Sequence, residues 1–276
     1  MINVAALTAN KVDPCSRFRF RQFIKPLAAL DIKVSEHYLP MTRYRRQPLA
    51  SIAMALRIPG VIASRSADIT WFRRELIPER VTLERFTGGH RVFDVDDAIW
   101  LLSKSDFSER IVAQCDAVIA GNAMLAEHYG KFGKPVWIVP TSIDTNAWSP
   151  ASQQPKQAWN IGWIGTNSNL RFLESIEEPL AAFLNDHSDA ILTVVCDKRP
   201  KFNLMPHDRW RFVKWSPENE VELVRGMGVG LMPLDDSDWS RGKCGFKMIQ
   251  YMSVGKPVVV SPFGVNKEIL EMGNVG

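Results

Sequence analysis

The sequence predicts an α/β protein made of two consecutive doubly wound domains, each built on a parallel sheet. Two observations indicate this fold class. Strand-length apolar segments alternate with helix-length segments along most of the chain, which is the β-α-β rhythm of a parallel sheet. The rhythm stops at a polar, proline-bearing segment, residues 149–158, and then starts again. Because 276 residues suffice for two domains of common size, we expect one domain over residues 1–148 and a second over residues 149–276.

The first domain opens on an apolar strand and includes an arginine-rich middle that we expect to be helical. The apolar patterns predict strands at residues 2–7, 33–35, 92–97, 117–120 and 136–139. They predict helices at residues 18–30, 108–114 and 122–129.

The second domain repeats the same rhythm. Its predicted strands are residues 160–165, 190–196, 211–213, 229–233 and 257–261. Its predicted helices are residues 169–185, 217–225 and 246–254, with Gly255 as a stop signal and a further helix after the last strand. Ligands of such sheets bind beyond the carboxyl ends of the strands, which directs attention to the polar loops there: 12–17, 94–100, 165–169, 197–199 and 234–245.

The composition is that of an ordinary soluble globular protein, with 46% hydrophobic and 23% charged residues. No apolar run approaches the ~18–20 residues of a membrane span, and the start lacks the features of a signal peptide, so we expect a cytoplasmic protein. The four cysteines and five histidines show no metal-ligand spacing and no disulfide framework. We therefore expect no cofactor and no obligatory metal.

The positive charge is concentrated in the first half of the chain. Residues 1–148 hold 20 Lys and Arg against 15 Asp and Glu, a net +5, while the remaining 14 and 15 give −1. Arginines cluster at positions 17, 19 and 21 and again at positions 43, 45 and 46. Such clusters suit phosphate groups or peripheral contact with an anionic membrane, and the alternative is solvated surface charge. No nucleic-acid-binding motif accompanies them, so we expect no nucleic-acid partner.

Two lysines lie unusually close to the start of a predicted helix. Lys243 and Lys247 are four residues apart, where like charges destabilise an isolated helix by roughly 0.2–0.5 kcal/mol. The helix N-terminus also favours anions over cations. A multiply charged anion such as a diphosphate between the lysines would resolve both conflicts, and the alternative is two solvated lysines whose stems cover apolar surface.

The loop at residues 165–169 joins a predicted strand to a predicted helix. Gly165, Thr166 and Asn167 offer backbone N–H groups and polar side chains at that point, which could hold a phosphate or cap the helix.

Two regions of the chain resemble glycosyltransferase family 4. The first is CDAVIAGNAMLAE at residues 115–127, followed by VWIVPTSIDTNAWSP at residues 136–150. The second is GVGLMPL at residues 228–234, followed by the segment from Lys243 to Glu268. The resemblance extends over nearly all of the chain and implies the GT-B fold, in which two Rossmann-like domains face a central cleft.

The family resemblance also implies an activity. The second domain would bind a nucleotide-diphosphate sugar, and the first would present a carbohydrate or lipid-linked acceptor. The reaction would retain the anomeric configuration and would serve polysaccharide or glycoconjugate synthesis. Lys243, Lys247 and Arg171 would then face the diphosphate together with the 165–169 loop, and Glu268 would lie in the same donor-binding region.

Several positions depart from the family pattern. The family commonly has two glutamates eight residues apart, and the corresponding positions are Gly242 and Gln250. Gln250 could still bind a ribose hydroxyl, while contact with the sugar would fall to the acids at 235, 236 or 238. In the first loop, DPCSRFR at residues 13–19 replaces the glycine pair that the family often has, and Ser16 and Arg17 are expected to begin the first helix. An arginine there suits an anionic acceptor or the donor diphosphate, with surface charge as the alternative. The family continues beyond position 276 with a further strand and crossover helices, so we expect an incomplete second domain.

Asp96 and Asp97 follow a predicted strand and have no basic residue beside them in the sequence. We expect them to hold the acceptor hydroxyl or assist its deprotonation, with a helix N-cap as the alternative role. His90 is a weaker candidate. Two other functions stay open: a nucleotide-sugar-binding homologue without turnover, and a Rossmann oxidoreductase, although no G-x-G-x-x-G follows the first strand.

Overall fold

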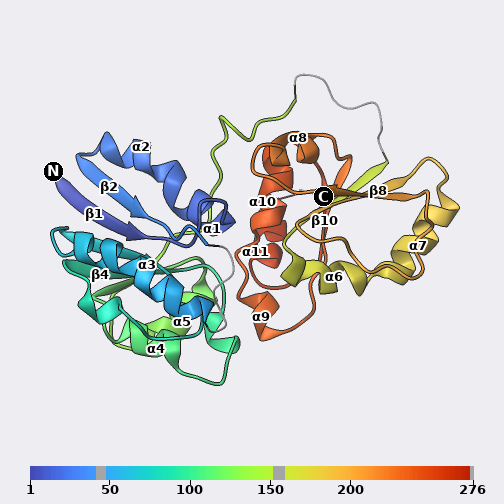
Figure 1. The fold of residues 1–276 in the computed structure, drawn as a ribbon. Coiled ribbons are helices and arrows are strands. Elements are labelled where there is room, and N and C mark those ends of the chain that lie inside the picture. The colour runs from blue at the N-terminus through green and yellow to red at the C-terminus, as the bar shows by residue number, and fades with distance from the viewer. Residues whose placement is uncertain (42–47, 152–158, 274–276) are drawn as a thin grey trace. The chain divides into compact units, whose positions relative to one another are not determined.

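The structure is a computed structural model that describes residues 1–41, 48–151 and 159–273 (Figure 1). Its contacts divide the chain into two units. The first is Met1–Ser142 with Gly242–Cys244, and the second is Ile143–Arg241 with Gly245–Gly276. The division falls six residues before the predicted boundary between positions 148 and 149. Most of the predicted linker, residues 152–158, lies outside the described residues.

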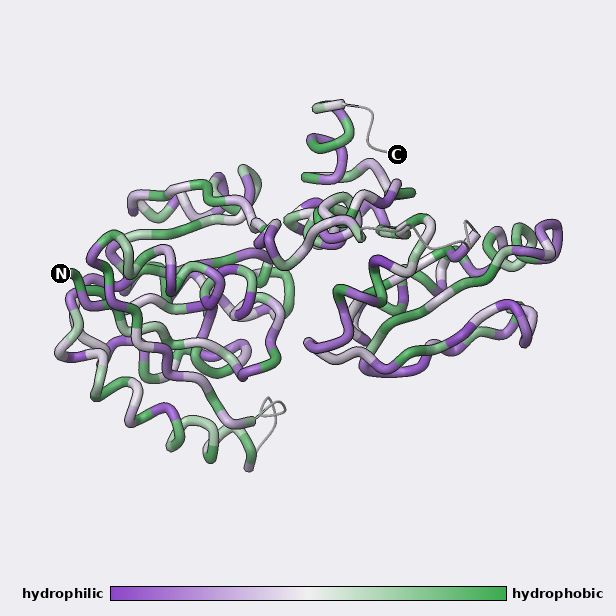
Figure 2. The backbone as a smooth tube through the Cα atoms, turned by 90° about the horizontal axis from the view of Figure 1, so that it is seen from above, coloured by the Kyte–Doolittle hydropathy of each residue, from purple (hydrophilic) through white to green (hydrophobic). Residues whose placement is uncertain are grey.

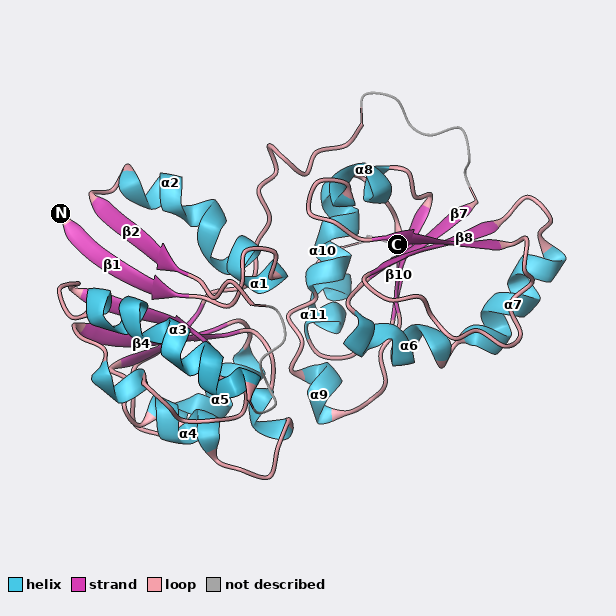
Figure 3. Cartoon of the chain, viewed as in Figure 1, coloured by secondary structure: helices cyan, strands magenta, loops and turns pink. Residues whose placement is uncertain are grey.

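The first unit is built on a six-stranded parallel sheet (Figure 3). In spatial order its strands are β2 (Ile32–His37), β1 (Ile2–Leu7), β3 (Ile69–Arg73), β4 (His90–Val95), β5 (Ala117–Ala120) and β6 (Val136–Ile138). Its helices are α1 (Pro14–Ser16), α2 (Gln22–Ala28), α3 (Leu49–Ser64), α4 (Phe107–Val112) and α5 (Ala123–Gly130), with short 3-10 turns at Glu84–Phe86 and Ile99–Leu101. Large apolar side chains from β3, β4, α4 and α5 form the core, Phe72, Phe93, Ile111 and Tyr129 among them.

The first helix begins earlier than predicted. Pro14 is its first residue because the Asp13 carboxylate accepts a hydrogen bond from the Ser16 backbone N–H at 2.7 Å, and proline suits the first helical position. The helix then passes through a π-helical turn, Arg17–Arg21, before α2. The predictions that Ser16 and Arg17 open the helix, and that it starts near residue 18, are therefore wrong.

The second unit contains a five-stranded parallel sheet (Figure 3). In spatial order its strands are β11 (Val258–Val260), β10 (Val229–Met232), β7 (Asn160–Ile164), β8 (Ile191–Cys196) and β9 (Trp210–Lys214). Its helices are α6 (Leu170–Glu174), α7 (Glu177–Asp186), α8 (Glu220–Arg225), α9 (Asp238–Arg241), α10 (Phe246–Ser253) and α11 (Val265–Glu271), with a 3-10 turn at Asn167–Asn169.

The single helix predicted over residues 169–185 is interrupted, and Pro179 explains the break. A proline inside a helix clashes with the carbonyl four residues before it, which here belongs to Ser175. The chain therefore ends α6 at Glu174 and restarts with α7 at Glu177, so that Pro179 lies in the first turn, where it is tolerated.

Tyr251 fixes α10 against the sheet of the second unit. Its hydroxyl accepts a hydrogen bond from the Ile164 N–H at 3.0 Å and donates one to the Leu231 carbonyl at 3.1 Å. A Cβ atom at Gly230 would lie 2.2 Å from the Tyr251 ring, so this close approach requires glycine. These contacts fix the last turn of α10 against β7 and β10.

Within the described residues, no helix is long and apolar enough to cross a membrane.

Candidate functional site

The carboxyl ends of β3 and β4 bring a group of acids and arginines together in the first unit. The two strands run parallel, with Arg73 in register with Asp94. Asp96 and Asp97 follow directly after β4, and Arg74 follows β3. Residues that are 21 to 23 positions apart in the sequence therefore meet at one edge of the sheet, where ligands of this architecture bind.

Arg19 and Asp94 form a buried ion pair behind this edge. The Nε and Nη2 atoms of Arg19 donate to the two Asp94 oxygens at 2.5 and 3.2 Å, and the two side chains are 3% and 2% exposed. Arg19 also donates to the Val139 carbonyl at 3.0 Å and to the Thr141 hydroxyl at 3.1 Å. Burial raises the pKa of Asp94, and the Arg19 charge opposes that rise. The pair ties α1 and its π-helical extension to β4 and to the segment after β6.

Arg73 holds Asp96 in the ionised state. Its Nη2 atom lies 3.1 Å from one Asp96 oxygen and 3.4 Å from the other, and its Nε lies 3.9 Å from an Asp13 oxygen. Burial acts to raise the pKa of Asp96, but the charges of Arg73 and Arg19 outweigh it and lower that pKa to about 2. A carboxylate with so low a pKa is a weak base and a good positioning group.

Asp97 has a different environment. Arg74 lies 3.7 Å and Lys243 3.8 Å from its two oxygens, and 25% of its side chain is exposed. Burial and the Asp96 charge raise its pKa, against the lowering effect of Lys243 and Arg74. Arg74 itself has a φ of +61°, which is rare for a residue with a side chain and indicates local backbone strain. Of the two predicted acids, Asp97 is therefore the better proton acceptor.

The alternative role of these acids as helix caps is excluded. The 3-10 turn after β4 starts at Ile99, its N-cap position is Ala98, and no side chain caps it. His90 lies at the opposite, amino end of β4 with 82% of its side chain exposed, so it is not part of this edge.

The first arginine cluster is directed largely at the chain's own carboxylates rather than outward. Arg21 pairs with Glu36 through two hydrogen bonds of 2.7 and 2.8 Å, as Arg19 does with Asp94. Ser16 is buried, and both its N–H and its hydroxyl donate to Asp13 at 2.7 Å. Arg17 stacks on the Phe18 ring at 4.9 Å. The second cluster, positions 43, 45 and 46, lies outside the described residues.

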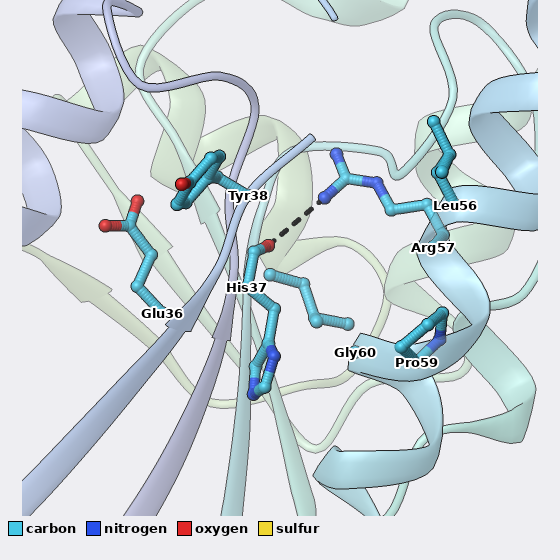
Figure 4. A pocket seen from close by; sticks show the side chains of 8 residues that line it. Glu36, His37, Tyr38, Leu56, Arg57, Pro59 and Gly60 are labelled. Carbon is cyan, nitrogen blue, oxygen red and sulfur yellow. Dashed lines mark hydrogen bonds between the residues drawn. The ribbon is translucent and has the colours of Figure 1, made fainter. Parts of the chain in front are cut away.

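A small hollow of about 240 Å³ lies between β2 and α3 in the first unit (Figure 4). His37 and Tyr38 line it on the strand side, and Leu56 and Gly60 on the helix side. The buried guanidinium of Arg57 closes one end, since it donates to backbone carbonyls of three neighbouring segments, including that of His37 at 3.4 Å. The hollow lies at the carboxyl ends of β1 and β2, whose last residues, Leu7 and His37, line it.

In the second unit, Lys247 and Gln250 interact on α10. The Lys247 ammonium donates to the Gln250 Oε1 at 2.6 Å. Gln250 is fully buried, and its Nε2 has no hydrogen-bond partner within the part of the chain that the structure describes. The N-cap of α10 is Gly245 in the left-handed conformation, with φ +64°. A buried amide donor without a partner is costly.

Several polar groups of the 165–169 loop form hydrogen bonds within the chain itself. The Asn167 N–H and side-chain amide both donate to Asp197, at 2.8 Å each, and the Thr166 and Ser168 hydroxyls lie 2.9 Å apart. A Cβ at Gly165 would lie 2.5 Å from the Trp163 ring, so this turn requires glycine. A carboxylate thus occupies the Asn167 N–H that was predicted to face a phosphate.

Arg171 lies near an ordered acidic loop in the same unit. Its Nη2 is 4.0 Å from Asp235, whose carboxylate accepts hydrogen bonds of 2.5 Å from the Ser237 and Ser240 hydroxyls. Burial acts to raise the pKa of Asp235, but the hydrogen bonds from Ser237 and Ser240 and the charge of Arg171 together outweigh it and lower that pKa. Glu268 is exposed on the first turn of α11.

Sequence reasoning missed the arginines that pair with the acids. Arg73 and Arg74 fall in the segment expected to be helical, because the pattern did not predict β3, and Arg19 belongs to the cluster expected to meet phosphate groups or an anionic membrane, or else to be solvated. The run Ile-Thr-Trp-Phe before Arg73 was the available signal, because a strand there places both arginines at the carboxyl edge.

Two parallel-sheet α/β units, each with its polar groups at the carboxyl edge, define the GT-B fold. Solved structures with this fold bear out that assignment. WaaG, a glycosyltransferase involved in lipopolysaccharide biosynthesis, matches with a TM-score of 0.66 and 12% identity over 98% of this chain and 84% of its own. The S. aureus MnaA–UDP co-structure matches with a TM-score of 0.61 and 14% identity over 94% and 79% of the two chains.

A UDP-GlcNAc 2-epimerase from Neisseria meningitidis bound to UDP-GlcNAc also matches, with a TM-score of 0.62 and 9% identity over 98% of this chain and 85% of that one. No family model and no curated protein matches the sequence significantly. Because a transferase and an epimerase share the fold at such low identity, the reaction has to be argued from the residues.

Proposed function

We propose that the protein is a glycosyltransferase of family 4, which transfers a sugar from a nucleotide-diphosphate sugar to an acceptor hydroxyl with retention of configuration. The observation that carries the proposal is the pair of polar carboxyl edges in a GT-B fold matched over 94–98% of the chain. The first edge offers a carboxylate of raised pKa, Asp97, and the second offers a lysine and a buried amide donor, Lys247 and Gln250.

For the donor, we assign the diphosphate to Lys247, Arg171 and the N-terminus of α10. An ammonium, a guanidinium and the N-terminal N–H groups of a helix stabilise negative charge as it builds on the leaving diphosphate. Gln250 would give its unpartnered Nε2 donor to a ribose hydroxyl. Gly165 and Thr166 would border the donor through backbone contacts, whereas Asn167 is held by Asp197 and contributes through that pair.

For the acceptor, we assign proton transfer to the first unit. The acceptor oxygen forms a bond to the anomeric carbon as the bond from that carbon to the diphosphate oxygen breaks. The acceptor proton passes to Asp97 or to the departing diphosphate. Asp96, held by Arg73, positions this edge, and the charges of Lys243 and Arg74 favour the ionised form of Asp97.

We further propose a cytoplasmic protein with a carbohydrate or lipid-linked acceptor in polysaccharide or glycoconjugate synthesis. The four cysteines carry no disulfide, which suits a reducing compartment. Catalysis by lysine, arginine and helix N–H groups requires no metal ion on the diphosphate.

A second candidate is a nucleotide-sugar-binding homologue without turnover. Two positions favour it, since Gly242 and Gln250 stand where family 4 commonly has glutamates. Gln250 retains hydrogen-bonding ability, but Gly242 has no side chain with which to contact the donor sugar.

Binding and turnover separate the two candidates. Calorimetric titration with UDP-, GDP-, ADP- and dTDP-sugars, with NAD as the control, should show selective binding of one nucleotide sugar. After incubation of that donor with glycan and lipid-linked acceptors, NMR should show that the product keeps the donor's anomeric configuration. The reaction rate should not fall when a chelator is added. Binding without any product would support the homologue, and no binding by the folded protein would refute both candidates.

A further inference from the structure

Three residues from late in the sequence, Gly242–Cys244, belong to the first unit. The strands of its sheet contain long hydrophobic stretches, and hydrophilic stretches lie in the segments between them (Figure 2). The tripeptide contacts two polar positions in such segments, Asp96 directly after β4 and Asn122 two residues after β5. These two strands are neighbours, with Val95 in register with Ala120. The tripeptide is therefore held at the carboxyl edge where the acids of the candidate site lie.

Asn122 uses both ends of its side-chain amide, and the residue is only 4% exposed. Its Oδ1 accepts a hydrogen bond from the Leu125 N–H at 2.9 Å and so caps α5. Its Nδ2 donates to the Gly242 carbonyl at 2.9 Å and lies 3.4 Å from the Lys243 carbonyl. A cap needs only the oxygen atom, which serine, threonine or aspartate also provides. The amide nitrogen therefore has a second task, which is to hold the backbone before Lys243.

Cys244 fixes the backbone on the other side of Lys243. Its thiol donates to the Asp96 carbonyl at 3.1 Å, and the residue is 8% exposed. The sulfur packs against Gly121, where a Cβ atom would lie only 2.4 Å from it. Burial raises the pKa of this thiol, and the charges of Asp96 and Asp97 add to the rise. The thiol therefore stays protonated and able to donate.

Lys243 lies between these two anchors. Its Nζ is 3.8 Å from an Asp97 oxygen, and 14% of its side chain is exposed. A lysine has a flexible four-carbon stem, so a backbone that is fixed on both sides restricts where the ammonium can lie. The other charges that act on Asp97 are those of Arg74 and Arg73, which favour its ionised form, and that of Asp96, which opposes it together with burial.

We propose that Asn122 is a positioning residue of the candidate site, which holds Lys243 beside Asp97 by anchoring the Gly242 carbonyl. Cys244 supports the same geometry from the other side. Asn122 acts through the lysine and touches no reacting atom. The geometric part of the proposal concerns the first unit alone, and its consequence for catalysis rests on the proposed role of Asp97 as the base.

The pKa of Asp97 in variants of the full chain tests the proposal without any substrate. Carbon-13 NMR of protein labelled at its aspartates follows the carboxyl group, and D97N identifies its resonance. K243M should raise the titration midpoint by about 1 pH unit or more, because an opposite charge at this distance typically lowers a carboxyl pKa by roughly 1–3. N122S keeps an oxygen that can cap α5 but loses the amide donor, so its midpoint should rise by a smaller amount.

A double variant shows whether Asn122 acts through the lysine. N122S/K243M should titrate like K243M, because the group that Asn122 positions is absent from both. Chemical acetylation followed by mass spectrometry should also show that Lys243 reacts faster in N122S than in the wild type, since its ammonium is no longer held beside Asp97. If N122S does not fold, C244A and C244A/K243M provide the same comparison at the other anchor.

N160S is the matched control. Asn160 is 2% exposed, and its Nδ2 donates to the Gly226 carbonyl at 2.7 Å within the second unit. The variant loses a buried hydrogen bond of the same kind and should leave the midpoint of Asp97 unchanged. An N122S midpoint equal to that of the wild type would overturn the proposal. So would a shift of the same size with and without Lys243, because Asn122 would then act on Asp97 by another route.

The acid limb of the pH–rate profile separates this inference from the proposed function. If Asp97 is the base, the limb should move to higher pH in N122S together with the NMR midpoint. If the midpoint moves and the limb does not, Asn122 positions Lys243 but Asp97 is not the base. If the limb moves while the midpoint stays, the positioning role of Asn122 is refuted.

Discussion

Replacing Arg19 with methionine should strongly destabilise the first unit. Methionine keeps an unbranched apolar stem of similar length but removes the guanidinium from Asp94, whose side chain is only 2% exposed. The variant leaves a buried carboxylate without its cation, and the Val139 carbonyl and Thr141 hydroxyl lose a donor at 3.0 and 3.1 Å.

The size of the effect follows from the protonation of the buried Asp94 carboxylate in the folded variant. Without Arg19, Asp94 takes up a proton in the folded state, while in the unfolded state it stays ionised above a pKa of about 3.9. At pH 7 that proton uptake costs about 4 kcal/mol, since each pH unit above the unfolded pKa adds about 1.4 kcal/mol. The value agrees with the roughly 3–5 kcal/mol lost when one partner of a buried ion pair is removed.

The sign of the pH dependence makes the reasoning testable. In R19M the folded state binds one proton more than the unfolded state near neutral pH, so its stability falls as pH rises. The stability gap to the wild type should shrink by about 1.4 kcal/mol per unit between pH 7 and pH 5. Scanning calorimetry and urea unfolding across this range measure it, and R19M/D94N should recover part of the loss. A gap below about 1 kcal/mol, or one that is independent of pH, would refute the argument.

Three further changes test other parts of the structure. G230A places a Cβ 2.2 Å from the Tyr251 ring and should cost about 1–3 kcal/mol in the unfolding of the second unit, or prevent folding. D97N should lower kcat roughly 10²–10⁴-fold with little change in donor affinity. It should also abolish the acid limb of the pH–rate profile, which the wild type should show at a pH above 3.8, the ordinary pKa of an aspartate, because the pKa of Asp97 is raised. K247A should weaken nucleotide-sugar binding about tenfold in calorimetry, whereas K267A, on the exposed face of α11, should not.

Each of these predictions has a control or a contrary outcome. G130A adds a methyl group at a position with nothing within 4 Å, and it should leave the unfolding temperature unchanged or raise it. If the acid limb of the pH–rate profile is unchanged in D97N, Asp97 is not the base. Only the ionised carboxylate accepts the proton, so the limb should report the protonation of the base as the pH falls. Equal nucleotide-sugar affinity in K247A and K267A would refute the assignment of the diphosphate to α10.

Elements specified by local signals were predicted closely. The strand at Ala117–Ala120 and the helix after it, which Asn122 caps, were predicted because an apolar run and a helix-length segment follow each other directly in the sequence. The helix at Phe246–Ser253 was predicted from its helix-forming residues and the glycine after it. These signals act within a few residues, so one sequence suffices to read them.

Strand β3 was not predicted, although it lies between β1 and β4 in the sheet. Its five residues, Ile69–Arg73, include two that are only partly buried, and two arginines follow the apolar run directly. Such a run is too short to separate a strand from the end of the helical segment before it. What makes it a strand is pairing with β1 and β4, which are distant in sequence, and tertiary contacts of that kind are not visible in a local window.

The same limit explains why the acids of the site were found and their partners were not. Asp96 and Asp97 stand out because they end an apolar strand, but their cations are Arg73 and Arg74 at the end of β3 and Lys243. Only the topology, which makes β3 the neighbour of β4, brings Arg73 to Asp96 and so separates an acid of pKa about 2 from one of raised pKa. The difference between two adjacent aspartates therefore lies in the strand order, and the roles that we propose for them, a positioning carboxylate and a base, depend on it.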